Sequence, residues 1–253
     1  MSSPRASHSC GIASSRRRGL GAALLALAGA AQAADTMVFS SDFDGPALPA
    51  QIGAGVAARE GVQGYAGLGP SGNQFGGSFL RSPTGNAVTL TLNGLAAHDR
   101  LSLGFLFAAI DSLDGTGNFP SGDFLNISLD GVSIFRESFA NALAGQVQSY
   151  VAPVGVELAR RVDLGFGGPG GFYTDSAYNL GADPRLQQLA HSGSTAVISF
   201  LIEGEGIQPL ADESWAMDNL QVSISSAVPE PASVAVWVLG LGVLAARRWR
   251  RAA

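Results

Sequence analysis

The chain contains no lysine, one cysteine and three histidines. The cysteine, Cys10, precedes the cleavage site predicted below, so the mature body has no disulfide, no thiol nucleophile and no cysteine ligand for a metal. Beyond that site only His98 and His191 remain, and no G-x-S-x-G motif occurs. Because a serine nucleophile needs a nearby base, this inventory argues against nucleophilic catalysis. We therefore predict no catalytic residues.

Basic charge is also scarce in the body of the chain. Eight of the fifteen arginines lie in the two terminal segments, and between Asp35 and Ala227 seven arginines face nineteen acidic residues, a net charge of −12. Nucleic-acid binding needs Lys and Arg to neutralise phosphates. The acidic body therefore excludes nucleic acid as a partner and favours divalent cations or neutral ligands.

The first 33 residues have the three parts of a secretory signal. An arginine run at 16–18 precedes an apolar run at 19–31, and Ala31 and Ala33 supply the small residues that signal peptidase requires. A membrane-spanning helix needs about 20 apolar residues, and this run is too short. We expect signal peptidase to cleave after Ala33 and residues 1–33 to be removed on export.

The tail, residues 227–253, has a second apolar run. Residues 232–246 follow the triplet Pro229-Glu230-Pro231 and precede a cluster of four arginines: Arg247, Arg248, Arg250 and Arg251. A fifteen-residue helix spans about 22 Å, barely enough to cross a bilayer. The arginines would stay in the cytoplasm by the positive-inside rule. This pattern predicts an inner-membrane anchor that leaves the body outside, but it does not account for the proline-rich triplet.

The triplet, the short helix and the arginine cluster, in that order, resemble the PEP-CTERM sorting signal of Gram-negative bacteria. The resemblance covers only the tail. It implies that Pro229, Glu230 and Pro231 are the motif recognised by an exosortase, a membrane transpeptidase. It also implies a membrane-anchored precursor bound for the cell surface or the extracellular matrix. The resemblance predicts where the protein is sorted and does not predict an activity.

The body between the two ends has the pattern of short β-strands. Thirty-four glycines favour many turns, and several stretches alternate apolar and polar residues. Asp130-Gly131 is a strong hairpin signal. The sequence predicts one all-β domain, a jelly-roll β-sandwich over residues 34–226, with one short helix from Pro184 to Ala190 capped by Asp183. The expected strands cover residues 37–43, 88–92, 101–107, 125–129, 132–135, 162–166, 197–201 and 215–224.

Three further patterns carry weaker chemical signals. Residues 67–72 match G-x-G-x-x-G, but no strand precedes them and no helix follows, so we interpret them as a loop. His98 precedes Asp99 in what we expect to be a solvated turn. Glu203 and Glu205 would face the same side of a strand, as paired glycosidase carboxylates do, although flanking glycines favour solvated side chains at a strand end.

Acidic loops indicate a cation site. Ca²⁺ takes six to eight oxygen ligands, which carboxylates on loops supply. The segments 110–115 and 212–219 resemble motifs of secreted lectin-like jelly-roll domains. In those domains the last strand's Asp-Asn helps to hold a structural calcium with acidic residues near the first strand. The alternative is that these residues only form turns. The predicted ligands are Asp42, Asp44, Asp111, Asp114, Asp123, Glu213, Asp218 and Asn219.

Glycan binding would use exposed aromatic side chains in the glycine-rich segments. Tyr65, Phe172 and Tyr173 are our candidates, with Phe75, Phe119 and Tyr178 as further members, although aromatic residues also fill sandwich cores. We predict a non-enzymatic, exosortase-sorted surface or matrix protein that binds or organises extracellular polysaccharide, with structural Ca²⁺. The alternatives are a purely structural matrix component and a secreted polysaccharide-active hydrolase.

Overall fold

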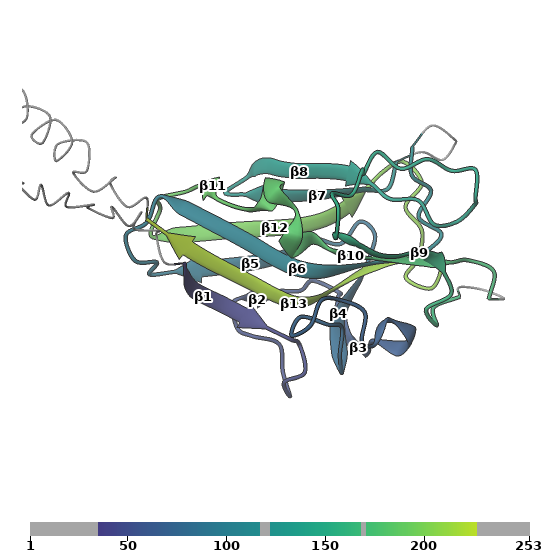
Figure 1. Ribbon diagram of the computed structural model, residues 1–253, viewed down its shortest axis with the longest axis horizontal. Helices are drawn as coiled ribbons and strands as arrows, with labels where there is room; N and C mark the ends of the chain where they lie inside the picture. The colour runs from purple at the N-terminus through teal and green to yellow at the C-terminus, as the bar shows by residue number, and fades with distance from the viewer. Residues whose placement is uncertain (1–34, 117–121, 168–170, 227–253) are drawn as a thin grey trace, which may run out of the picture. The chain divides into compact units, whose positions relative to one another are not determined.

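The computed structural model describes residues 35–116, 122–167 and 171–226 (Figure 1). The predicted signal peptide, with Ala31 and Ala33, lies outside these residues. So do the sorting motif, the helix at 232–246 and the arginine cluster. Among the described residues, no helix has the length and apolar character needed to span a membrane.

Two antiparallel sheets form the body, and Figure 1 shows β7, β8 and β12 in one layer and β6, β10 and β13 in the other. The larger sheet has the order β3-β4-β13-β6-β10-β9, with β1 on β13 and β11 on β6; the smaller has the order β2-β5-β12-β7-β8. The larger sheet comprises β1 (Thr36–Ser41), β3 (Ala58–Gly61), β4 (Ser78–Pro83), β6 (Arg100–Asp111), β9 (Glu157–Val162), β10 (Asp175–Asn179), β11 (Leu189–Ala190) and β13 (Glu213–Ser225). The smaller comprises β2 (Ile52–Gly53), β5 (Val88–Asn93), β7 (Phe124–Leu129), β8 (Val132–Ser138) and β12 (Thr195–Glu203).

The order of the central strands is that of a jelly roll. From β4 the chain crosses to β5, back to β6 and over to β7, forms the β7–β8 hairpin, and then alternates through β10, β12 and β13. The result is β4-β13-β6-β10 facing β5-β12-β7-β8. Two sheets wound in this way, with consecutive strands passing between them, make a jelly roll. The predicted all-β class and jelly-roll architecture are confirmed.

The central strand β6 is buried on both faces. Leu103, Phe105 and Phe107 point into the core between the two sheets. Leu106 and Ile110, which alternate with them, join a second apolar cluster on the outer face of the larger sheet. Loop residues from before β4 and from the segment after β9 cover part of that outer face, and this explains why β6 is apolar almost throughout.

The predicted hairpin is present, because Asp130 (φ 50°) and Gly131 (φ 81°) both have the positive φ that a two-residue type I′ turn needs. The strand predicted at 162–166 is wrong, since β9 ends at Val162. Beyond it the carboxylate of Asp175 accepts a hydrogen bond from the backbone N–H of Leu164 at 2.9 Å. A side chain thus takes the place of a neighbouring strand as the partner of this backbone group.

The predicted helix is also corrected. Asp183 does cap a turn, since its side chain accepts a hydrogen bond from the Arg185 N–H, but the turn is a 3₁₀ helix, η3, of only three residues (Pro184–Leu186). Another 3₁₀ turn, η2 (Leu180–Ala182), precedes it, and an earlier one, η1 (Gln63–Tyr65), precedes β4. Gln188 has a φ of 55°, which breaks the helix before β11 pairs with β6.

Candidate functional site

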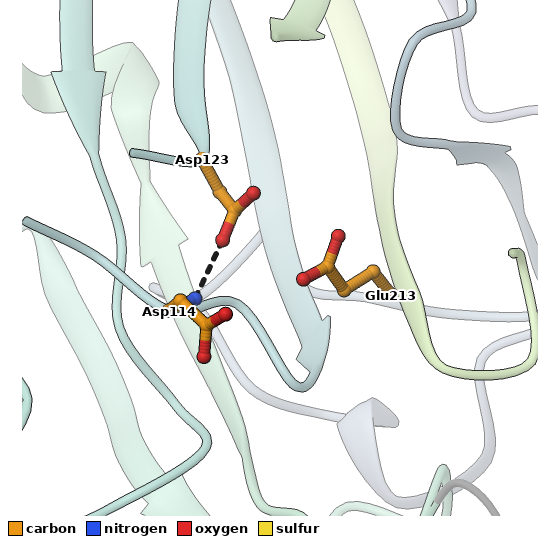
Figure 2. A group of neighbouring side chains, drawn as sticks. All are labelled: Asp114, Asp123 and Glu213. Atoms are coloured by element: carbon orange, nitrogen blue, oxygen red, sulfur yellow. Dashed lines mark hydrogen bonds between the residues drawn. The ribbon is translucent and has the colours of Figure 1, made fainter. Parts of the chain in front are cut away.

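Three predicted metal ligands meet where β6 ends and β7 and β13 begin. Asp114 follows β6, Asp123 directly precedes β7, and Glu213 is the first residue of β13. One carboxylate oxygen from each lies within 4.8 Å of the others, and Figure 2 shows the three side chains converging from three separate segments. We call this group the carboxylate trio.

Hydrogen bonds hold each member of the trio in place. The Asp114 N–H donates to the Asp123 carboxylate at 2.6 Å, the dashed line in Figure 2. The Gln146 side chain donates to Asp114 at 2.6 Å, and the backbone and side-chain nitrogens of Gln208 donate to Glu213 at 3.0 and 3.1 Å. Among the described residues, no arginine forms an ion pair with the trio.

Burial raises the pKa of all three carboxyl groups, and repulsion within the trio adds to the shift for Asp123 and Glu213. For Glu213 burial and then the charge of Asp123 raise the pKa to about 8, and for Asp123 burial is the main cause of a pKa of about 6. Burial likewise raises the pKa of Asp114. Three carboxylates held together without a basic partner suit an oxygen-seeking divalent cation, which would relieve their repulsion. The residues present therefore fit Ca²⁺.

Three other predicted ligands, Asp42, Asp44 and Asp218, form a second acidic group. Asp44 accepts a hydrogen bond from the Ser78 N–H at 2.6 Å, and Asp218 accepts one from the Gly76 N–H at 3.1 Å. Burial raises the pKa of Asp218 to about 7, and the charges of Asp44 and Asp42 add to the shift. In this group no three ligand atoms meet as those of the trio do.

The remaining predicted ligands, Asn219 and Asp111, have other contacts. The Asn219 side chain donates to the Gln74 carbonyl at 2.9 Å. Asp111 is buried near Arg81, with 3.6 Å between the Asp111 carboxylate and the guanidinium, and the charge of Asp175 helps burial to raise its pKa to about 7. The structure thus divides the eight predicted ligands among separate places in the fold, and only three of them form the trio.

The aromatic candidates are mostly core residues. Tyr65, predicted to contact glycan, has no exposed surface, because its ring packs against Phe75 and Phe79 beneath the loop that covers the larger sheet. Tyr178 is equally buried. Tyr65 is therefore corrected from a surface residue to a packing residue. Phe119 lies outside the described residues.

Phe172 and Tyr173 differ from the other aromatic candidates. The Phe172 side chain is 68% exposed, and its ring meets that of Tyr173 edge to face at 5.4 Å. Burial and then the charges of Asp212 and Asp114 raise the pKa of Tyr173, which places it close to the trio. Both residues stay predicted glycan contacts.

The weaker sequence candidates have structural partners. Glu203 forms an ion pair with Arg136 at 3.3 Å, and Glu205 is exposed. His98, expected in a solvated turn, is buried, because the pairing of β11 with β6 brings its ring to 2.7 Å from that of His191. Residues 67–72 follow η1 and contain no strand or helix, as the loop interpretation predicted.

A cavity that sequence reasoning missed lies on the outer face of the larger sheet. It has a volume of about 210 Å³, and strands β1, β6, β10 and β13, turn η2 and the loop before β4 line it. No charged side chain is among its lining residues. We call it the amide cavity, after the side chains that give it its polar character: Asn73, Asn179, Gln187, Asn219 and Gln221.

The signal for this cavity is diffuse in the sequence. Its amide side chains come from five places between residues 73 and 221, and no two of them share a recognisable motif. Amide residues scattered at this spacing look like ordinary turn and surface residues. Only the pairing of β6 with β10 and β13 brings them together.

The tail matches a known motif. Residues 227–251 match the PEP-CTERM protein-sorting motif, so the PEP-CTERM signal predicted for the tail is confirmed, and the recognition roles of Pro229, Glu230, Pro231 and the arginine cluster stay predictions. The match covers the tail alone. A search of the curated proteins found no sequence match.

Solved structures with related folds were also found. The CBM22-2 xylan-binding domain of Paenibacillus barcinonensis Xyn10C has 12% identity and a TM-score of 0.32, over 74% of this chain and 99% of that one. The Clostridium thermocellum Xyn10B CBM22-1–GH10 modules have 9% identity and a TM-score of 0.32, over 79% of this chain and 30% of that one. A GH87 α-1,3-glucanase catalytic domain has 15% identity and a TM-score of 0.30, over 79% of this chain and 29% of that one. At these TM-scores the likeness carries no inference about what this chain binds.

Proposed function

We propose that this chain is an exported protein of a Gram-negative bacterium that is sorted by an exosortase to the cell surface or the extracellular matrix. There its jelly-roll body binds extracellular polysaccharide without catalysis. The sorting motif at residues 227–251 supports the address. The observation that carries the binding role is the amide cavity, a polar and uncharged hollow on the surface of an acidic domain.

The route follows from the two ends of the chain. Signal peptidase would cleave after Ala33, and the helix at 232–246 would hold the precursor in the inner membrane with its arginines in the cytoplasm. Exosortase would then recognise Pro229, Glu230 and Pro231.

Fractionation of a Gram-negative host that has an exosortase tests this route. We expect the full chain to reach the surface or medium, and the Glu230→Ala variant to accumulate in the inner membrane. Glu205→Ala, which removes an exposed acidic residue of the body, is the matched control. Equal distribution of the wild-type chain and the Glu230→Ala variant would contradict the proposed sorting.

We also propose a structural Ca²⁺ in the carboxylate trio. Asp114, Asp123 and Glu213 would hold the ion, and waters or backbone carbonyls would complete the six to eight oxygens that Ca²⁺ takes. The ion would join the end of β6 to the starts of β7 and β13. Its role would be to stabilise a body that has no disulfide.

Burial of the trio favours a structural over a catalytic role. A glycosidase needs two carboxyl groups that reach the scissile bond from a cleft. Glu213 has no exposed surface and Asp123 has almost none, so a polysaccharide chain has no access to them in this conformation. Glu203 is paired with Arg136.

Binding of the full chain, purified in mild detergent, to immobilised polysaccharides tests the binding role. We expect retention on at least one polymer and no release of reducing sugar during incubation. Retention on none of the polymers would favour the purely structural matrix component. Release of reducing sugar that Glu213→Gln abolishes would favour the hydrolase.

A further inference from the structure

The amide cavity contains two buried polar atoms without a partner. The side-chain oxygens of Asn73 and Asn179 are buried and accept no hydrogen bond from any described residue. Asn179 is only 8% exposed. Leaving a buried acceptor unpaired destabilises a protein by about 1–3 kcal/mol. Two such acceptors from a loop and from β10 line one cavity, and this convergence indicates that a ligand with hydrogen-bond donors satisfies them.

Two neighbouring amide side chains, those of Gln187 and Asn219, donate hydrogen bonds to the backbone. Both side-chain N–H groups of Gln187 are engaged, since its nitrogen donates to the carbonyls of Leu103 at 2.9 Å and Gly181 at 3.0 Å. The Asn219 nitrogen donates to the Gln74 carbonyl. Their side-chain oxygens have no such restraint, so the cavity is rich in acceptors and has no positive charge. The remaining amide and hydroxyl groups of the lining offer both donors and acceptors, the combination that a sugar hydroxyl group uses, and no positive charge is present to attract a carboxylate, phosphate or sulfate group.

The size and floor of the cavity fit a single ring. A cavity of about 150 Å³ accommodates a six-membered ring, and this one measures about 210 Å³. Gly104 and Gly181 form part of its floor, and neither has a positive φ that would require glycine. A Cβ on Gly104 would lie 3.4 Å from the Cα of Gly181, so the two missing side chains let the backbones of β6 and η2 approach closely at this floor.

The rim adds an apolar contact. Met37 on β1 lines the cavity and is 52% exposed. A thioether side chain adapts its shape to a partner, and the C–H face of a sugar ring is such a partner. The cavity thus combines acceptors for hydroxyl groups with one flexible apolar side.

We propose that the amide cavity binds one sugar ring of a neutral polysaccharide, whose hydroxyl groups form hydrogen bonds with the amide side chains that line it, Asn73 and Asn179 among them. This inference rests on the proposed polysaccharide-binding function and gives it a site and a ligand class. Uronate polymers are disfavoured because the cavity has no positive charge and the body of the chain is acidic.

The test uses the full chain in mild detergent, with four neutral polymers (glucan, xylan, mannan and galactan) and alginate as the uronate probe. Gln221→Trp blocks the cavity from an exposed rim position, and Gly104→Val forces η2 away from β6 at the floor and so distorts the cavity. Ser133→Trp, at an exposed position of β8 in the other sheet, is the matched control. Thermal unfolding checks that each variant is folded, and Gln221→Trp carries the test alone if Gly104→Val does not fold.

We expect the wild-type chain to bind at least one neutral polymer, both cavity variants to lose at least about tenfold in affinity, and Ser133→Trp to lose nothing. Wild-type binding that Gln221→Trp leaves intact would overturn the cavity as the site while leaving the proposed function standing. Binding to alginate alone would overturn the neutral ligand class. A wild-type chain that binds no polymer would instead overturn the proposed function.

Discussion

The carboxylate trio and the amide cavity are both polar sites that involve strands β6 and β13 of the larger sheet, yet they are chemically opposite. The trio gathers Asp114, Asp123 and Glu213 without a basic partner, and the cavity gathers amides without any charge. Gly104 in the cavity and Asp111 at the trio's end of β6 are seven residues apart, about 23 Å along an extended strand. One strand therefore serves two separate sites.

The difference teaches what each site can hold. Repulsion among carboxylates is relieved by a cation, and at Glu213 burial first and then the charge of Asp123 raise the pKa. Unpaired amide oxygens are satisfied by neutral donors. A ligand for one site has no reason to bind the other, so changes at the two sites should act independently.

Calcium gives the largest expected effect and separates the two sites directly. At a Ca²⁺ concentration about 100-fold above its dissociation constant, the free energy of unfolding should rise by about 2.7 kcal/mol. Glu213→Gln should abolish this increase, whereas Asn179→Ala in the cavity should keep it. Thermal unfolding with Ca²⁺ and with EDTA measures both. A similar increase in the wild type and in Glu213→Gln would contradict the binding of Ca²⁺ at the trio.

The pH dependence of stability tests a buried carboxylate outside both sites. Burial raises the pKa of Asp175 to about 6. The pKa of an aspartate in the unfolded chain is about 4, so the folded state holds the Asp175 proton more tightly than the unfolded state does. This difference stabilises the folded protein fully below about pH 4, and the stabilisation is lost as the pH rises through about 6. Between about pH 4 and pH 7.5, in EDTA, the wild type should lose about 2 kcal/mol more than Asp175→Asn. Denaturant unfolding at each pH measures the free energy of unfolding of both proteins. Parallel pH profiles for the wild type and Asp175→Asn would contradict the raised pKa of Asp175.

A pair of asparagines tests the unpaired acceptor in the cavity. Without ligand, Asn179→Ala should stabilise the protein by about 1 kcal/mol, because it removes a buried oxygen that has no partner. Asn86→Ala should destabilise it by about 1–2 kcal/mol, since Asn86 donates to Ala54 and Ser82 and accepts from Val56. Urea unfolding compares them. Equal destabilisation by both would mean that Asn179 is satisfied in the folded protein.

The smallest expected effect concerns Phe172, the exposed aromatic residue that contacts Tyr173. Phe172→Ala should change the free energy of unfolding by less than about 0.5 kcal/mol, because the side chain is largely exposed. It should also leave retention on a neutral polysaccharide unchanged, with or without EDTA, if binding is confined to the amide cavity. Loss of retention on Phe172→Ala would extend the binding surface to the trio's end of the sheet.

Much of the fold was predictable from the sequence because alternation reports burial directly. The strands that alternate cleanly, such as Val88–Asn93 and Thr195–Glu203, are present. Predictions failed where a side chain replaced a backbone partner, as Asp175 does at Leu164. Short strands such as β10, which is buried throughout, have no alternation to reveal them and were missed.

The candidate sites were less predictable for a physical reason. Composition alone indicated a cation site, but eight acidic and amide residues on several loops leave many groupings open. Glu213 and Asp218 share one register of β13 against β6, and because they are five residues apart they point to opposite faces of the larger sheet. The trio thus depends on strand register and loop closure, which single residues do not encode.

The sequence by itself determined the address and the architecture of this protein. The sorting motif is local, and the strands follow from the period of two that places every second side chain in a core. Only the tertiary structure decided which carboxylates converge, that Tyr65 is buried, and that five amides surround an uncharged cavity. These outcomes join residues far apart in the chain, and their geometry exists only once the strands have paired in register.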